Sequence, residues 1–574
     1  MSSDLTSVDP SAVDPSAAGT GTVAEHDDDV ATDAPARSPE AAAPAERRRT
    51  RRVAAWTATT LACLLVLFAL MVPNDLTSVT PGEFVRIPLE GLIGVALVAV
   101  LSPRLRLVVA VVAGVVLGLL AILKIADIGF YEALNRPFHP VFDWPFLGAG
   151  AEFLTQTLGR AGGIAAVAVT GILFIGVLVL MTLSVLRLTR IVARHGPVAL
   201  GGTAVLAVAW VACAALGAQL VPGVPVAANA FGRLGQVPVD LNDHKTFAGQ
   251  IARDPFQATR GSQLLTGLRG KDVILSFVES YGRVAVYDPE VAAALDAGNG
   301  RLRAAGFAAR SAFLTSPTFG GGSWLAHGTL LSGLWIDNQQ RYDTLVSSDR
   351  LTLTKAFRKA SWRTVGVMPG NTRPWSEAGF YGAQRVYDHW NMGYRGPGFN
   401  WGTPPDQYTL SAFQRFERAA PNHAPVMAEF PTVTSHSPWA PTPHLIGWNQ
   451  VGNGSIYGPM AKVGDQPAKV WRSPSRVRAA YMNSIVYSLN TLISYVETYG
   501  GDNLVLVFVG DHQPAPIVSG PHADHDVPIT IVAKDQAVLN RTSGWNWQDG
   551  LRPGPRAPVW RMDAFRDRFL HAFS

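Results

Sequence analysis

Five apolar segments near the start of the chain limit its folds more than any other feature. They cover residues 53–72, 87–101, 107–122, 163–186 and 197–220, and the first carries no charge over a stretch of about twenty residues, the length that crosses the hydrocarbon core of a bilayer. The second holds Glu90 near one end. So many nearly uncharged segments in succession argue against a soluble protein. The sequence therefore predicts an α-helical membrane domain of about five spans over residues 53–220.

Basic residues lie at alternate ends of these segments. They occur at residues 47–52, at Arg104 and Arg106, and within residues 187–194. Under the positive-inside rule all three clusters can face the cytoplasm. The N-terminus is then cytoplasmic, and an odd number of spans places everything after residue 220 outside the membrane.

The remaining composition divides the chain further. Residues 1–46 are mainly Ala, Pro, Ser, Thr and acidic residues, which cannot bury a core, so residues 1–52 are expected to be a disordered acidic tail that ends in a basic run. Residues 221–253 are expected to be a linker, and residues 254–574 one large domain. The two cysteines, Cys63 and Cys213, both fall in apolar segments, which excludes a disulfide scaffold and a thiolate metal site in that domain. The net charge of +5 gives no argument for nucleic-acid binding.

The large domain alternates short β-rich runs with helical stretches. Near-continuous apolar runs alternating with helices indicate an α/β domain with a mostly parallel sheet. The predicted strands are residues 273–278, 364–368, 426–433, 504–509 and 529–532, and the clearest predicted helices are residues 351–359 and 477–499.

Polar residues follow four of these predicted strands. In open α/β sheets the functional site lies at the carboxyl ends of the strands, so these residues are expected to converge. Oxygen and imidazole ligands without thiolate suit Mn²⁺, Mg²⁺ or Zn²⁺. The residues are Glu279 after the first strand, Arg373 and Trp375 after the second, His436 after the third, and Asp511 and His512 after the fourth.

A glycine-rich stretch ending at Ser323 precedes a further apolar run. Three successive glycines let the backbone approach a ligand closely, and a helix that starts at Ser323 would present N–H groups to phosphate oxygens. A hydroxyl there can be activated by metal coordination. Each piece alone also has an ordinary explanation as a turn or a cap. Their joint placement at strand ends favours a metal-dependent site acting on phosphorus or sulfur.

Three motifs give the chain a resemblance to a known family. They are FVESYG at residues 277–282, GGGS at residues 320–323 and GDHQP at residues 510–514. With the apolar segments, they resemble the lipoteichoic acid synthase group of the alkaline phosphatase superfamily, a group also described as sulfatase-like membrane proteins. The resemblance implies an alkaline phosphatase-like fold and one divalent metal ion, manganese or magnesium in preference to zinc.

The resemblance also implies roles for individual residues. Glu279, Asp511 and His512 would bind the metal together with Ser323, the nucleophile. Ser323 departs from the threonine that is common in the synthases, and Thr318 is the alternative nucleophile. His436, Trp375 and Arg373 would contact substrate, although the family's arginine two residues beyond the tryptophan is replaced here by Glu377.

The implied activity is transfer of a phosphoglycerol-type head group. The donor would be a phosphatidylglycerol-like lipid of the outer leaflet, and the acceptor a glycan or glycolipid of the cell envelope. A phosphodiesterase, a phosphatase and a catalytically inactive envelope binding protein are the alternatives. A sulfatase is disfavoured because the Cys/Ser-x-Pro-x-Arg motif is missing; its nearest match, residues 472–476, has Arg472 at the position of the modified residue. His522, His525 and Asp526 are candidates for a second metal site, with a plain polar loop as the competing interpretation.

Overall fold

The computed structural model describes residues 43–76, 79, 87–215, 232, 235, 242–400 and 402–574. The chain divides into two compact units, residues 1–58 and 59–574. In the first unit the described part is the beginning of helix α1 (Ala43–Met71), which includes the basic run. The rest of the predicted tail and much of the predicted linker lie outside the described residues.

The apolar segments form helices of unequal length. Within the described residues, four helices are long and apolar enough to cross a membrane, and they lie in α1, α3 (Pro103–Leu134), α4 (Trp144–Arg194) and α5 (Gly196–Ala215). The second predicted segment forms α2 (Leu89–Val100), whose 12 residues extend about 18 Å against a hydrocarbon core of about 30 Å. Pro88 immediately precedes this helix, and the extended Leu101 follows it. The expected five spans are therefore four long helices and one short helix. The expectation that the large domain lies outside the membrane needs an odd number of spans, so it requires that α2 also crosses the membrane.

Helices α3 and α4 pack closely because α3 carries two glycines four residues apart. A Cβ atom at Gly114 would lie 2.7 Å from the Cα atom of Thr182, and one at Gly118 would lie 2.9 Å from Leu178 Cδ1. Small residues at this spacing let helix backbones approach each other in a membrane. Lys124 of α3 donates to the carbonyls of Ala69 (2.9 Å) and Val72 (2.5 Å), which satisfies acceptors at the end of α1.

The described part of the large domain is built on a mixed, nine-stranded sheet of order β4-β3-β5-β1-β6-β7-β2-β8, with β9 paired to β2. The first five strands in this order are parallel, β7 is antiparallel to β6, and β2 is antiparallel to β7. The carboxyl ends of β1, β5, β6 and β2 therefore lie at one edge of the sheet, together with the beginning of β7. The strands are β1 (Asp272–Val278), β2 (Ala308–Thr315), β3 (Arg363–Met368), β4 (Arg385–Asp388), β5 (Val426–Thr432), β6 (Leu504–Gly510), β7 (Asp526–Ala533), β8 (Gln548–Asp549) and β9 (Val559–Arg561).

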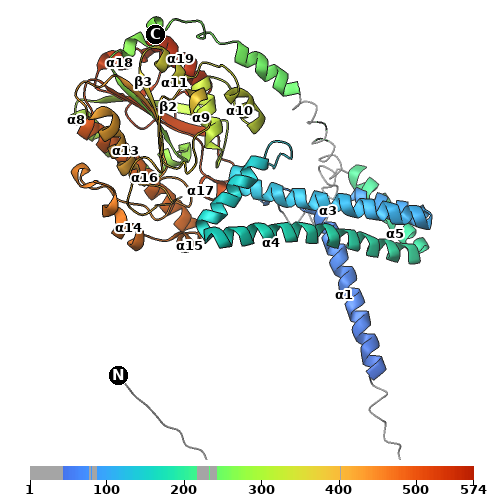
Figure 1. Ribbon diagram of the computed structural model, residues 1–574. Coiled ribbons are helices and arrows are strands. Elements are labelled where there is room, and N and C mark those ends of the chain that lie inside the picture. Colours follow the sequence, from blue (N-terminus) through green and yellow to red (C-terminus); the bar gives the residue numbers. More distant parts are fainter. Residues whose placement is uncertain are drawn as a thin grey trace, which may run out of the picture. The chain divides into compact units, whose positions relative to one another are not determined.

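Helices cover both faces of this sheet (Figure 1). Strand β1 shows why, because its seven residues are all buried and alternate side chains join two different cores. One core includes side chains of α8, α13 and α16, and the other includes side chains of α9, α10, α11, α18 and α19. The helices are α7 (Arg283–Val286), α8 (Pro289–Ala304), α9 (Ser323–Ser332), α10 (Gln339–Val346), α11 (Leu353–Lys359), α12 (Ala378–Tyr381), α13 (Asp406–Phe413), α14 (Gly458–Val463), α15 (Pro467–Val470), α16 (Pro474–Tyr499), α17 (Pro516–Ser519), α18 (Gln536–Asn540) and α19 (Ala564–Phe573).

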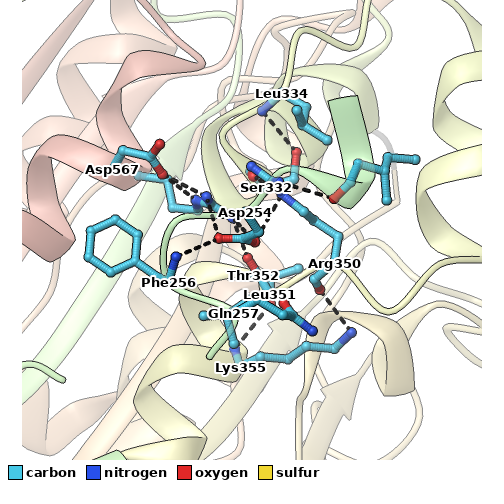
Figure 2. Close-up of polar contacts among 12 residues, drawn as sticks. Asp254, Phe256, Gln257, Ser332, Leu334, Arg350, Leu351, Thr352, Lys355 and Asp567 are labelled. Carbon is cyan, nitrogen blue, oxygen red and sulfur yellow. Dashed lines mark hydrogen bonds and ion pairs between the residues drawn. The ribbon is translucent and has the colours of Figure 1, made fainter. Parts of the chain in front are cut away.

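A buried ion cluster ties the beginning of the domain to its end (Figure 2). The Asp254 carboxylate forms ion pairs with two guanidinium groups, that of Arg566 at 2.9 Å and that of Arg350 at 3.2 Å. All three side chains are almost completely buried. Burial and repulsion from Arg566 lower the pKa of Arg350 to about 10. Asp567 provides the cluster with a second, partly exposed carboxylate, 2.6 Å from Arg566.

Candidate active site

Three predicted metal ligands meet at the carboxyl ends of β1 and β6. Glu279, Asp511 and His512 each offer one ligand atom, and these atoms lie within 4.8 Å of one another. His512 Nε2 lies 3.4 Å from Glu279 Oε1 and 3.6 Å from Asp511 Oδ2. Strands β1 and β6 are paired in register, which places the residues that follow them side by side. Within the described residues this is the one cluster of such side chains close enough to hold a metal ion.

The contacts of these side chains fit a divalent cation. Asp511 Oδ1 accepts from the backbone N–H groups of Ser280 (2.7 Å) and His512 (2.8 Å), whereas the buried Oδ2 atom has no hydrogen-bond partner. His512 Nδ1 lies 2.8 Å from the carbonyl oxygen of Gln513. A carbonyl only accepts, so Nδ1 carries a proton and Nε2 is available as a ligand. Two carboxylates and an imidazole therefore converge on one point where a buried oxygen lacks a partner.

Ser323 lies against this cluster. Its Oγ atom is 3.1 Å from Glu279 Oε2 and 3.2 Å from His512 Nε2. It is the first residue of α9, and Gly322 caps the helix in the left-handed conformation with φ of 79°. The predicted arrangement of a hydroxyl at a helix N-terminus beside the metal ligands is therefore present. Thr318 has a different environment, because its hydroxyl donates to the carbonyl of Gly321 and so closes the loop.

The loop before Ser323 is fastened to the strand end that carries Asp511 and His512. Ser316 Oγ donates to the carbonyl of Asp511 at 2.5 Å, and Gly320 N donates to the carbonyl of Gln513 at 2.9 Å. The Gln513 carbonyl is the one that also accepts from His512 Nδ1. The glycines therefore serve a bend that a side chain would strain, since Gly320 has φ of 69° and Gly322 has φ of 79°.

His436 follows β5 at the same edge of the sheet. Burial lowers its pKa, and the neighbouring His512 adds to that effect, so His436 is neutral near pH 7. The strand end is anchored by the buried Asp406, which accepts from the backbone N–H groups of Val433 (2.9 Å) and Thr434 (3.1 Å). Strand β5 pairs with β1, and Glu279 N donates to the carbonyl of Thr432 at 3.3 Å, so His436 follows a strand end that adjoins the cluster.

Two other predicted substrate contacts lie after β3. Arg373 is exposed, and Trp375 is half-buried. The Trp375 ring stacks on Tyr381 with 5.2 Å between ring centroids. It also lies close to Gly366, where an added Cβ atom would be 2.8 Å from the ring atom Cζ3. Its indole therefore packs against the domain core, so the structure gives it a packing role in addition to the proposed substrate contact.

Two residues of the proposed second metal site, Asp526 and His525, contact protein groups in this structure. Asp526 Oδ2 accepts from Arg283 at 2.7 Å, and its Oδ1 accepts from Thr315 at 2.9 Å. His525 Nδ1 lies 3.2 Å from the carbonyl of Ser316, and His522 is exposed. These contacts favour the interpretation of a polar loop beside the site.

Sequence reasoning overlooked a second pair of ionisable side chains near the cluster. His327 of α9 and Glu429 of β5 lie 3.1 Å apart, and neither follows a strand end. The available signal was the spacing of four residues from Ser323 to His327, which places both on one face of a helix.

The titration of the cluster predicts how metal binding depends on pH. Burial raises the pKa of Asp511 to about 6, and the Glu279 charge adds to the rise. Burial lowers the pKa of His512, but the charges of Asp511 and Glu279 outweigh that effect and the net shift is upward. Protons on these ligands compete with a metal, so we expect Mn²⁺ affinity of the full chain in detergent to fall as the pH drops toward 6.5, where His512 is already protonated, by about tenfold per pH unit. Below about pH 6, where Asp511 also takes up a proton, the fall should be steeper. Isothermal titration calorimetry across that range checks this, and an affinity unchanged by pH would contradict it.

Comparison with known proteins gives structural matches only. No protein-family model matches the chain, and no curated protein matches it. Among solved structures, the lipoteichoic acid synthase LtaP from Listeria monocytogenes has 14% identity and a TM-score of 0.36, covering 52% of this chain and 71% of that one. The lipooligosaccharide phosphoethanolamine transferase EptA, an integral membrane protein from Neisseria meningitidis, has 12% identity and a TM-score of 0.43, covering 86% and 87%. The phosphoglycerol transferase GacH from Streptococcus pyogenes has 11% identity and a TM-score of 0.34, covering 58% and 90%.

Proposed function

We propose that this protein is a membrane-bound, metal-dependent transferase of phospholipid head groups. In its specific form, it moves a phosphoglycerol-type group from a phosphatidylglycerol-like lipid to a glycan or glycolipid acceptor of the cell envelope. The alternation of basic residues along the apolar segments supports a cytoplasmic N-terminus and a large domain outside the membrane. That side of the membrane is where the outer-leaflet donor and the envelope acceptor are found.

The observation that carries this proposal is the position of Ser323. A serine hydroxyl at the first residue of a helix lies 3.1 Å from a carboxylate oxygen and 3.2 Å from an imidazole nitrogen. Both of those atoms belong to the cluster suited to a metal. Such an arrangement suits nucleophilic attack on a phosphate diester.

In the proposed reaction, Ser323 Oγ forms a bond to phosphorus while the bond to the diacylglycerol oxygen breaks. The Ser323 hydroxyl gives up its proton, diacylglycerol takes up a proton and leaves as an alcohol, and the head group stays on Ser323 as a phosphodiester. An acceptor hydroxyl then attacks the same phosphorus and releases Ser323. The helix N-terminus favours the negative charge that gathers on the phosphate oxygens, and the neutral His436 can hydrogen-bond to one of them.

A divalent cation would be held by Glu279, Asp511 and His512. When bound, it would lower the pKa of a nearby hydroxyl and offset phosphate charge. Manganese or magnesium is preferred to zinc in this proposal, and metal analysis of the purified protein would identify the ion.

Labelled lipid tests the proposed function directly. The full chain is reconstituted in vesicles containing phosphatidylglycerol with a labelled glycerol head group, with and without a glycolipid acceptor. We expect diacylglycerol release that depends on divalent metal, and label on the acceptor when it is present. Label released only as free glycerol phosphate would indicate a hydrolase and contradict transfer. Absence of diacylglycerol release in every metal would contradict a lipid donor of this kind.

A further inference from the structure

The His327–Glu429 pair lies beside the proposed active site but has no part in the chemistry described above. Glu429 is in the middle of β5 and is 1% exposed. A buried carboxylate is costly unless it is paired, and His327 Nδ1 lies 3.1 Å from its Oε1 atom. The carboxylate only accepts, so Nδ1 of His327 carries the proton. Glu429 therefore fixes both the tautomer and the orientation of the imidazole ring.

His327 also connects the nucleophile helix to the strand that ends at a proposed metal ligand. It lies four residues after Ser323, on the same face of α9. Its ring stacks on Phe277 of β1, with 3.7 Å between centroids and 14° between the ring planes. Phe277 precedes Glu279 by two residues and so lies on the same side of the chain. The ring is therefore a spacer between α9 and β1.

The separation of α9 and β1 determines the distance between Ser323 and Glu279. Their side-chain oxygens lie 3.1 Å apart, and a shift of α9 toward β1 or away from it would change this distance directly. The His327 ring lies between α9 and β1, about one helical turn after Ser323 along α9. Glu429, on the neighbouring strand β5, keeps the ring in place, because β5 and β1 pair in register with Leu275 opposite Glu429.

We propose that His327 and Glu429 are positioning residues that set the geometry of Ser323 and Glu279 and thereby the affinity of the site for a divalent metal. This inference concerns the same site as the proposed function, and it depends on that site binding a metal but not on the transfer reaction. It goes further by assigning a role to two ionisable residues outside the Glu279, Asp511 and His512 cluster, the buried Glu429 and the partly buried His327.

Mn²⁺ affinity of the full chain in detergent, measured by calorimetry, tests the proposal. Residues that orient metal ligands from outside the coordination shell change affinity about 10- to 100-fold when replaced. We expect losses in this range for Glu429→Leu and for His327→Ala. Glu429→Gln keeps an acceptor for Nδ1–H, so its loss should be clearly smaller. The double variant H327A/E429L should be no weaker than the worse single variant, because both changes break one unit.

A matched control separates positioning from general damage to the helix. Thr329 is completely buried in α9, and its hydroxyl accepts from the backbone N–H group of Ile336 at 3.0 Å. Thr329→Val removes that bond at the far end of the same helix, and we expect Mn²⁺ affinity to stay at the wild-type value even where the melting temperature falls. Equal losses of affinity in Thr329→Val and Glu429→Leu would overturn the proposal, as would unchanged affinity in both Glu429→Leu and His327→Ala. The readout is metal binding, so a wild-type protein that binds Mn²⁺ but lacks transferase activity would contradict only the proposed function.

Discussion

Replacing Ser323 by Ala is expected to reduce head-group release by at least about a thousandfold, because the attacking oxygen is lost. Mn²⁺ binding should be weakened by the loss of the Ser323 oxygen but remain measurable, since Glu279, Asp511 and His512 are unchanged and still converge. Diacylglycerol release from labelled vesicles measures the loss, and calorimetry measures the retained metal. Ser323→Thr keeps a hydroxyl at the same position and should recover part of the activity.

Thr318→Ala is the matched control for this experiment. The Thr318 hydroxyl donates to the Gly321 carbonyl within the same loop, so its removal loosens the loop without removing the proposed nucleophile. We expect a partial loss of activity. An inactive Thr318→Ala protein beside an active Ser323→Ala protein would reverse the assignment of the two hydroxyls. Full activity in both variants would exclude the Ser323 and Thr318 hydroxyls as the nucleophile.

The second large effect is expected on stability, at the buried cluster shown in Figure 2. Asp254→Ala leaves the guanidinium groups of Arg350 and Arg566 buried, with Asp567 as the remaining carboxylate of the cluster. Breaking a buried ion pair from one side costs about 3–5 kcal/mol, because the remaining charge stays uncompensated. Denaturation of the full chain in detergent, followed by tryptophan fluorescence, would measure this loss.

Asp296→Ala provides the comparison for Asp254→Ala. Asp296 also pairs with an arginine through two oxygens, at 3.0 Å and 2.8 Å from Arg552, but both side chains are largely exposed. Exposed pairs contribute about 0–1 kcal/mol, so this variant should unfold almost like the wild type. Similar losses of unfolding free energy in the two variants would contradict the view that burial makes the Asp254 ion pairs stabilising.

The sequence was most informative where apolar runs were long. The five predicted strands correspond to β1, β3, β5, β6 and β7, and the predicted helix of residues 477–499 corresponds to α16 (Pro474–Tyr499). Strand β2 (Ala308–Thr315) was not predicted, because its sequence AARSAFLT mixes charged and small residues with apolar ones. Its burial comes from β7 and β9 on its two sides, which a single sequence does not reveal.

For the candidate site, the sequence predicted the residues that directly follow the strands, but not the contacts between side chains far apart in the chain. Residues that directly follow β1 and β6 could be expected together, because parallel strands share their carboxyl edge. The His327–Glu429 contact joins a helix to a strand about a hundred residues away, and no local pattern marks it. The same holds for Arg283, whose pairing with Asp526 bears on the proposed second metal site.

The carbonyl of Gln513 accepts two hydrogen bonds, one from the Gly320 backbone and one from the His512 ring. A rotation of this peptide plane that improves one bond tilts the oxygen away from the other donor. The position of the loop that presents Ser323 is therefore coupled to the orientation of the His512 ring. A sequence change that moves the loop is therefore also expected to turn the imidazole, because both depend on the same carbonyl.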